Sequence, residues 1–200
     1  MDIKEYTEFS AKNDGFIASL FFLREFENLV RKRRPKRILE VGIGMGTIPY
    51  FVRHFKDTFE YVGTEIVDAC IERLKINAPF VKLFKTIKEV QERERESRGG
   101  FDIIVVDGKD EDIDKLGLML NKNGIILVEA DRRDQVEIIK SFVKRKFVHY
   151  RKRPFSLRKS PGYTSFIFEP SLSEYLNAKF MHCWYLLKSK TQMTINQIIK

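Results

Sequence analysis

Three glycines at alternate positions form the most informative motif of the chain. They are Gly42, Gly44 and Gly46, and they follow the apolar run RILEV at residues 37–41. Glycine permits a tight turn and lets the backbone approach a ligand closely, because no Cβ lies in the way. Such a loop between a strand and a helix would place a small-molecule ligand across the carboxyl ends of parallel strands. A turn that serves the fold alone is the other interpretation.

The residues around the glycines distinguish between classes of ligand. Nucleotide hydrolases cradle phosphates with a longer loop that ends in Lys and Ser or Thr, whereas here Thr47 follows Gly46 without such a lysine. The dinucleotide fingerprint requires glycine or alanine at the position of Thr47. The spacing therefore argues against a phosphate-cradling loop and fits a nicotinamide cofactor less well.

Short runs rich in β-forming residues alternate with helical patterns through the middle of the chain. The runs are RILEV (37–41), EYVGTE (60–65), FVKLF (80–84), FDIIVVD (101–107) and GIILVEA (124–130). This alternation is typical of a parallel sheet with helices on both faces. Two further runs, 147–155 and 163–170, are joined by a loop with Pro161 and Gly162, which predicts a hairpin. We expect an α/β, Rossmann-like, doubly wound and mostly parallel seven-stranded sheet with a C-terminal antiparallel hairpin.

The chain of 200 residues is long enough for one domain with a helical extension at either end. Apolar residues between 17 and 30 recur at helical spacing, and the basic run RKRRPKR at 31–37 follows them. We expect this helix to end at the basic run, since Pro35 stops its continuation. The predicted organisation is a helical segment at 1–34, a cofactor-binding domain at 35–170, and a C-terminal helix and tail at 171–200.

The glycine loop, with an acidic residue before it, resembles the first motif of the class I S-adenosylmethionine (SAM)-dependent methyltransferases. Glu40 holds the acidic position, and the resemblance covers about residues 35–170. In that family the second strand ends in an acidic side chain that accepts hydrogen bonds from both ribose hydroxyls, and Glu65 stands there. The fourth strand of the family ends in an acidic residue beside the methyl-transfer site, which corresponds to Asp107, followed by Gly108.

The resemblance implies SAM as the cofactor and a set of residues that bind it. The end of the third strand departs from the family, because Phe84-Lys85-Thr86-Ile87 lacks the usual acidic or polar residue near the adenine. Adenine recognition would then use backbone groups, Thr86, or packing against Ile66 and Ile87. The cofactor-binding residues implied are Glu40, Gly42, Ile43, Gly44, Gly46, Glu65, Ile66, Thr86, Ile87, Asp107 and Gly108.

Asp107 is the predicted catalytic residue, and its surroundings indicate the kind of acceptor. It would orient either the methionine amino group or the acceptor. The segments VVDGKDED and LVEADRRD look like those of small-molecule O-methyltransferases, some of which bind a divalent cation through an Asp on the fourth strand end and an Asp-Asn pair on the fifth. Asp107 matches, but Glu129-Ala130-Asp131-Arg132 lacks the Asn. We expect methyl transfer to an oxygen of a small molecule, without an essential metal.

The basic composition leaves an RNA methyltransferase as an alternative. The formal net charge is +9, and basic residues concentrate at 31–37 and 144–159, where aromatic residues are interleaved. Such a surface could follow phosphates and stack on bases. Asp107-Gly108 differs from the Asn/Asp-Pro-Pro-aromatic motif of amino-methylating members, which argues against base methylation. A third alternative is a protein of this fold that binds cofactor or RNA without catalysis.

Cysteine usage and hydropathy argue against other classes of protein. Cys70 and Cys183 are far apart in sequence and neither has metal-ligand spacing, so we expect buried thiols. No run of eighteen apolar residues is present to span a bilayer, and the N-terminus lacks a secretory pattern. A cytoplasmic protein with no membrane association is the expectation.

Overall fold

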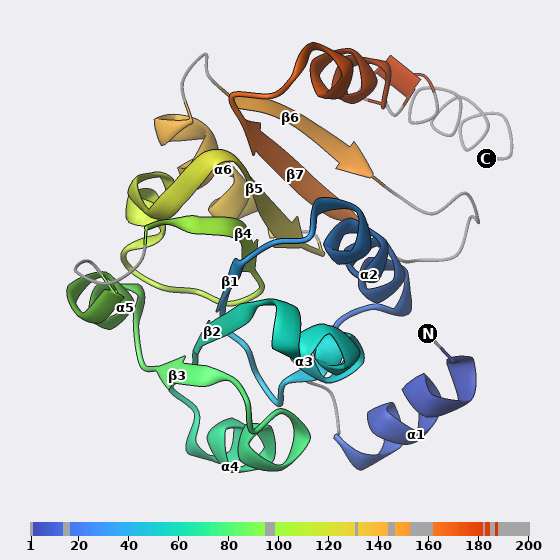
Figure 1. Cartoon of the computed structure of the whole chain (residues 1–200), viewed down its shortest axis with the longest axis vertical. Helices are drawn as coiled ribbons and strands as arrows, with labels where there is room; N and C mark the ends of the chain where they lie inside the picture. The colour runs from blue at the N-terminus through green and yellow to red at the C-terminus, as the bar shows by residue number, and fades with distance from the viewer. Residues whose placement is uncertain are drawn as a thin grey trace, which may run out of the picture.

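A mixed β-sheet with the strand order β3-β2-β1-β4-β5-β7-β6 runs through the molecule (Figure 1). Strands β1 to β5 are parallel, whereas β7 is antiparallel to both β5 and β6. The predicted α/β, Rossmann-like architecture is confirmed. The strands are β1 (Arg37–Val41), β2 (Glu60–Thr64), β3 (Lys82–Phe84), β4 (Phe101–Val106), β5 (Leu120–Glu129), β6 (Phe147–Lys152) and β7 (Tyr163–Phe168).

The computed structural model describes residues 2–13, 17–94, 99–130, 132–143, 162–181, 183–184 and 187, and the backbone alone of 147–152. Side chains are therefore described for six strands of the sheet, β1 to β5 and β7, rather than for the seven predicted. The backbone of β6 pairs with β7 in the antiparallel sense. The loop between them, 153–161, lies outside the described residues, so the predicted hairpin is supported in part.

Helices cover both faces of the sheet and form two apolar cores. Successive side chains of a strand point to opposite faces, so Ile103 and Ile104 belong to different cores. Helices α1 (Ile3–Lys12), α2 (Leu20–Arg33), α3 (Thr47–Val52) and α4 (Asp68–Asn77) contribute to the first core, while α5 (Ile87–Glu94), η2 (Ile113–Met119) and α6 (Arg133–Phe142) contribute to the second. A short helix, η1 (Arg53–Thr58), links α3 to β2, and residues 172–181 form a further helix.

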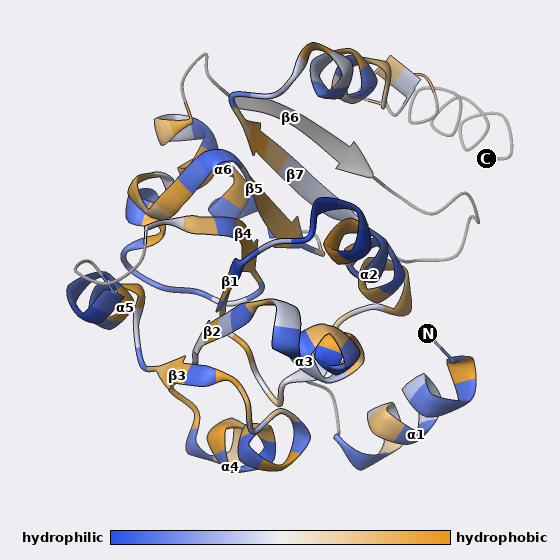
Figure 2. Cartoon of the chain, in the orientation of Figure 1, coloured by the Kyte–Doolittle hydropathy of each residue, from blue (hydrophilic) through white to orange (hydrophobic). Residues whose placement is uncertain are grey.

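Helix α5 lies at the surface and packs on the sheet through a narrow apolar stripe. Figure 2 colours it mostly blue, and its two buried apolar residues are Ile87 and Val90, one helical turn apart. Burial of this narrow apolar stripe against the sheet holds the helix. None of the helices in the described part of the chain is long and apolar enough to cross a membrane.

Helix α2 ends within the basic run, as predicted. Its N-cap is Ser19, whose side chain accepts a hydrogen bond from the backbone N–H of Phe22. The helix continues to Arg33 and ends at Arg34 in the left-handed conformation, directly before Pro35. Basic side chains in the last turn interact favourably with the negative end of the helix dipole. The run therefore completes the helix, and Pro35 follows it.

The ends of β1 and β4 meet at two glycines. A Cβ added to Gly42 would lie 2.3 Å from the Cα atom of Gly108, and one added to Gly108 would lie 2.6 Å from the Cα atom of Gly42. Real Cβ atoms do not approach backbone this closely, so neither position tolerates a side chain without movement of the backbone. The contact fixes the start of the glycine loop against the loop that follows β4.

We predict that Gly42→Ala destabilises the ligand-free protein by about 2 kcal/mol more than Gly99→Ala. Both glycines have a left-handed φ, +76° and +80° respectively, so both variants carry similar backbone strain. Only Gly42 faces backbone, because the atom nearest to a Cβ at Gly99 is a side-chain atom 3.9 Å away. Urea unfolding measures the difference in the free energy of unfolding. Equal losses in the two variants would show that the Gly42–Gly108 contact does not matter for stability.

Candidate functional site

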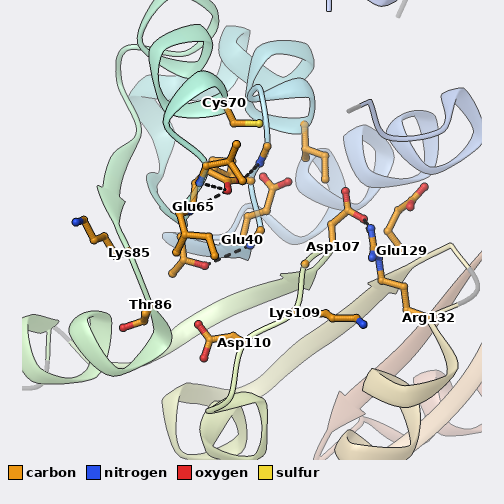
Figure 3. A pocket seen from close by; sticks show the side chains of 18 of the residues that line it. Glu40, Glu65, Cys70, Lys85, Thr86, Asp107, Lys109, Asp110, Glu129 and Arg132 are labelled. Carbon is orange, nitrogen blue, oxygen red and sulfur yellow. Dashed lines mark hydrogen bonds and ion pairs between the residues drawn. The ribbon is translucent and has the colours of Figure 1, made fainter. Parts of the chain in front are cut away.

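A cavity of about 860 Å³ lies at the carboxyl ends of β1, β2, β4 and β5 (Figure 3). Ligands of open parallel sheets bind at this edge, because loops from several strands converge there. Figure 3 shows Asp107, Glu129 and Arg132 together on one side of the cavity and Lys85 and Thr86 on the opposite side. The described lining residues are Ile17, Ala18, Glu40, Gly42, Ile43, Gly44, Thr47, Ile48, Thr64, Glu65, Ile66, Val67, Cys70, Lys85, Thr86, Lys88, Asp107, Gly108, Lys109, Asp110, Glu111, Asp112, Glu129 and Arg132.

Most of the residues predicted to bind the cofactor line this cavity. Gly46 does not: it precedes α3, and a Cβ there would lie 2.5 Å from Cδ1 of Leu74. Ile87 does not either, because it is fully buried in the core beneath α5. The predicted residues that line the cavity are Glu40, Gly42, Ile43, Gly44, Glu65, Ile66, Thr86, Asp107 and Gly108.

Glu65 connects the end of β2 to the glycine loop. Its Oε2 atom accepts a hydrogen bond of 2.8 Å from the backbone N–H of Gly44, and its Oε1 atom accepts bonds from Ile66 and Val67 at 2.8 and 2.9 Å. Each carboxylate oxygen has two lone pairs, so Oε2 keeps one for a further donor. The side chain thus shapes the loop and still offers an acceptor to a ligand hydroxyl.

Glu40 is a buried carboxyl group at the base of the cavity. The hydroxyl of Tyr61 donates a hydrogen bond of 2.6 Å to its Oε2 atom. Burial raises the pKa of Glu40 well above its usual range, the Tyr61 hydrogen bond opposes that shift, and the negative charges of Asp107, Glu129 and Glu65 raise the pKa further. A cation bound in the cavity would stabilise the ionised form.

Asp107 lies directly after β4 and is held by Arg132. The Nε atom of Arg132 donates to Oδ1 of Asp107 at 3.0 Å, and the Nη2 atom donates to the same oxygen. The backbone N–H of Asp107 donates to the carbonyl of Val41 at 2.9 Å, which fixes the end of β4 beside β1. Burial and the charge of Glu129 raise the pKa of Asp107 to about 6, although Arg132 pulls it down.

The cavity is acidic although the chain is basic. Its described lining has seven carboxyl groups, Glu40, Glu65, Asp107, Asp110, Glu111, Asp112 and Glu129, against four cationic groups, Lys85, Lys88, Lys109 and Arg132. The whole chain has a formal net charge of +9. A site that inverts the sign of the protein's charge is suited to a cationic ligand.

Several lining residues were not assigned by the sequence. Glu129 ends β5 and accepts a hydrogen bond from the backbone N–H of Ser19, and Arg132 follows it. Asp110 accepts from the N–H groups of Ile87 and Asp112, which ties the loop after β4 to the start of α5. Their common signal is a charged residue within a few positions of a strand's carboxyl end. That signal identifies the edge of the sheet but not which side chain turns inward.

Metal-ligand and thiol chemistry have little support among the described residues. The described residues contain no group of three or more His, Cys, Asp or Glu side chains placed to hold a metal ion. Asp131 lies outside the described residues. Cys70 lines the cavity as a buried thiol, and burial raises its pKa, so it stays protonated. Cys183 is exposed, contrary to the expectation that both thiols are buried.

Part of the basic run at 31–37 has carboxylate partners within the protein. Arg37 is buried and pairs with Glu60 and Glu94, with its guanidinium 4.4 Å from the centre of the Phe101 ring. Arg33 pairs with Glu174, and Arg31 pairs with Glu27. These pairs reduce the positive charge that the run offers to phosphates. Most of the second basic segment, 144–159, lies outside the described residues.

Comparison with known proteins gives structural but not sequence matches. No family model matches, and no curated protein does. An O-methyltransferase from Bacillus cereus, solved with S-adenosylhomocysteine (SAH), superposes with a TM-score of 0.64 at 13% identity, over 82% of this chain and 88% of that one. The O-methyltransferase TomG from Streptomyces achromogenes, solved with SAM, gives 0.62 at 16% identity over 78% and 82%. A methyltransferase from Geobacter sulfurreducens gives 0.62 at 13% over 84% and 89%.

We predict that Asp107→Asn changes how stability depends on pH. The pKa of Asp107 in the folded protein, about 6, lies above its ordinary value of 3.8, so its contribution to stability is complete below about pH 4 and is lost as pH rises through about 6. Asn cannot ionise and does not suffer this loss. Relative to the wild type, the variant should gain about 2 kcal/mol in free energy of unfolding between about pH 4.5 and 7.5.

Urea unfolding of the ligand-free protein at the two pH values measures this gain. Asp57→Asn is the control, because Asp57 is exposed on η1. The control should follow the wild type at both pH values. If Asp107→Asn also followed the wild type, Asp107 would not be the group that titrates with a raised pKa.

Proposed function

We propose that this chain, which has the fold of the class I SAM-dependent methyltransferases, transfers the methyl group of SAM to an oxygen of a small molecule. The acidic cavity on a basic protein carries the proposal. SAM has a sulfonium and an ammonium group, and both favour a site rich in carboxylates. The pyrophosphate of a dinucleotide would instead meet buried carboxyl groups, and burial together with neighbouring negative charges already raises the pKa of Glu40 and Asp107.

The residues around the cavity fit the parts of SAM by their chemistry. Glu65 keeps an acceptor for the ribose hydroxyls, since only one bond is made to its Oε2 atom in the described part of the chain. Ile66 and Thr86 line the cavity and would receive the adenine, and Thr86 lies on the side opposite Asp107 (Figure 3). Glu40 and Asp107 offer carboxylates to the cationic end. Gly44 leaves room for the backbone to approach the cofactor, whereas the missing Cβ of Gly42 makes room for Gly108.

When bound, SAM would supply an electrophilic methyl group, which passes from its sulfur to the acceptor by in-line displacement. The chain therefore needs to orient the acceptor, exclude water and, for a hydroxyl acceptor, accept a proton. The position of Asp107 after β4 and its hydrogen bonds from Arg132 support it as the group for the last task. No covalent bond to the enzyme is required.

A small-molecule acceptor is favoured over RNA because Arg31, Arg33 and Arg37 are paired with carboxylates of the same chain, although the pair of Arg31 is at the surface. The O-methyltransferases among the similar structures support the same choice. The alternative is a protein that binds SAM but transfers no methyl group, and an assay of methyl transfer distinguishes the two.

We predict that SAM and SAH stabilise the protein against heat, whereas NAD does not. A ligand at about a hundred times its dissociation constant adds about 2.7 kcal/mol, which raises Tm by about 5 to 10 °C for a domain of this size. Glu65→Gln should lose most of the shift, because the amide presents N–H groups where the carboxylate accepts hydrogen bonds. Differential scanning fluorimetry with each ligand gives the result.

The control is Glu72→Gln, since Glu72 is exposed on α4 and pairs with Lys75 away from the cavity. It should keep the full shift. A shift with NAD alone, or none with SAM and SAH, would overturn the proposed cofactor. A shift with SAM but no labelled product from SAM carrying a tritiated methyl group, over a panel of hydroxyl compounds, would leave a binding protein instead of an enzyme.

A further inference from the structure

Arg132 is the cationic residue that the structure places on the predicted catalytic carboxylate. It precedes α6, and both of its hydrogen bonds to Asp107 end on the single oxygen Oδ1. Its side chain is 33% exposed and that of Asp107 is 19% exposed, and both line the cavity. A ligand in the cavity can therefore reach both groups.

The pairing leaves each partner with unused hydrogen-bonding capacity. A guanidinium has five N–H groups, and Arg132 donates two of them, one from Nε and one from Nη2. Its other N–H groups donate to nothing in the described part of the chain. The Oδ2 atom of Asp107 likewise accepts no hydrogen bond from the described residues. A donor for an oxyanion and an acceptor for a proton thus stand side by side.

We propose that Asp107 and Arg132 together form the acceptor site, and that Arg132 stabilises the negative charge that develops on the acceptor oxygen. The acceptor oxygen binds the unused N–H groups of Arg132, and its proton goes to Oδ2 of Asp107. This inference rests on the proposed methyl transfer. It assigns to Arg132 the stabilisation of negative charge that a bound cation could otherwise provide.

The atoms of the step balance without a further reactant. The acceptor O–H bond breaks and its proton moves to Asp107. The oxygen then forms a bond to the methyl carbon while the sulfur–methyl bond breaks. The products are a methyl ether and SAH, and Asp107 later releases the proton to water.

Other charged groups lie around Asp107, but none of them takes the place of Arg132 in stabilising negative charge on the acceptor oxygen. Glu129 faces Asp107 with negative charge and opposes an anionic acceptor. Burial raises the pKa of Glu40 well above its usual range, and the hydroxyl of Tyr61 donates a hydrogen bond to this side chain. Lys109 lines the cavity as an exposed cation. Among the described residues, Arg132 is the cation that donates hydrogen bonds to Asp107. Removing its charge should therefore expose an anionic acceptor to repulsion from the neighbouring carboxylates.

The test uses 4-nitrophenol, whose anion absorbs visible light, with the full chain saturated with SAH so that no turnover occurs. We expect the wild type to bind the anion and to lower the pKa of the bound phenol. Arg132→Met should weaken binding about tenfold or more and abolish the spectral shift, because it removes hydrogen bonds to a charged oxygen. Arg132→Lys keeps the charge without the planar fork and should fall between the two.

Arg133→Met is the matched control, since Arg133 is the adjacent arginine, is exposed, and does not line the cavity. It should bind 4-nitrophenol like the wild type. A second control is 4-nitroanisole, which has no ionisable hydroxyl and should bind equally to the wild type and to Arg132→Met.

Three results would distinguish the possible failures. If SAH stabilises the wild type and both arginine variants equally, but Arg132→Met retains the spectral shift of 4-nitrophenol, the acceptor site is wrong and the cofactor proposal stands. If SAH does not bind the wild type, the proposed function itself is wrong. Loss of SAH binding in Arg132→Met alone would mean that Arg132 supports the cofactor and would also overturn the assignment.

Discussion

The repulsion among carboxylates at one edge of the sheet is the constraint on which the site depends. Glu40, Glu65, Asp107 and Glu129 stand at or beside the carboxyl ends of β1, β2, β4 and β5, because parallel strands end at a common edge. Each is held by a different donor: a tyrosine hydroxyl, backbone N–H groups, a guanidinium, and the backbone N–H of Ser19. These donors keep the carboxylates close together, and burial, together with the neighbouring negative charges, raises the pKa of Glu40 and Asp107.

Contacts between backbone segments maintain this arrangement. Gly42 and Gly108 touch without room for a side chain, and Glu65 holds Gly44 from the neighbouring strand. The glycines therefore have two roles, because they bring the strand ends together and also leave space for a ligand. A loop held in this way is shaped before binding, which reduces the entropy lost when a ligand binds.

The sequence predicted the sheet and the position of the site, but not the partners of the charged residues. The strands were readable because apolar runs alternate with helical patterns, and the glycine loop indicated the ligand-binding edge. Arg37 looked like part of an exposed basic run, yet it is buried with Glu94, 57 positions away. Likewise, the predicted run at 124–130 begins at Leu120 in β5, because a shift in register between Phe101 and Ile103 accommodates the extra residues. Both features depend on which distant segments become neighbours, and local pattern does not contain that information.

The role proposed for Arg132 depends on where its guanidinium lies in the structure and not on the sequence motif around it. In the sequence, Arg132 lies in the segment where some O-methyltransferases have a metal-binding Asp-Asn pair. The missing Asn indicated only that a metal ligand is absent. In the structure its guanidinium lies on Asp107 and still faces the cavity. A residue that does not match a family's motif can therefore still bring a positive charge to the cavity. Because the guanidinium is fixed on its carboxylate, an acceptor oxygen entering the cavity meets a positive charge that requires little further reorganisation to bind it.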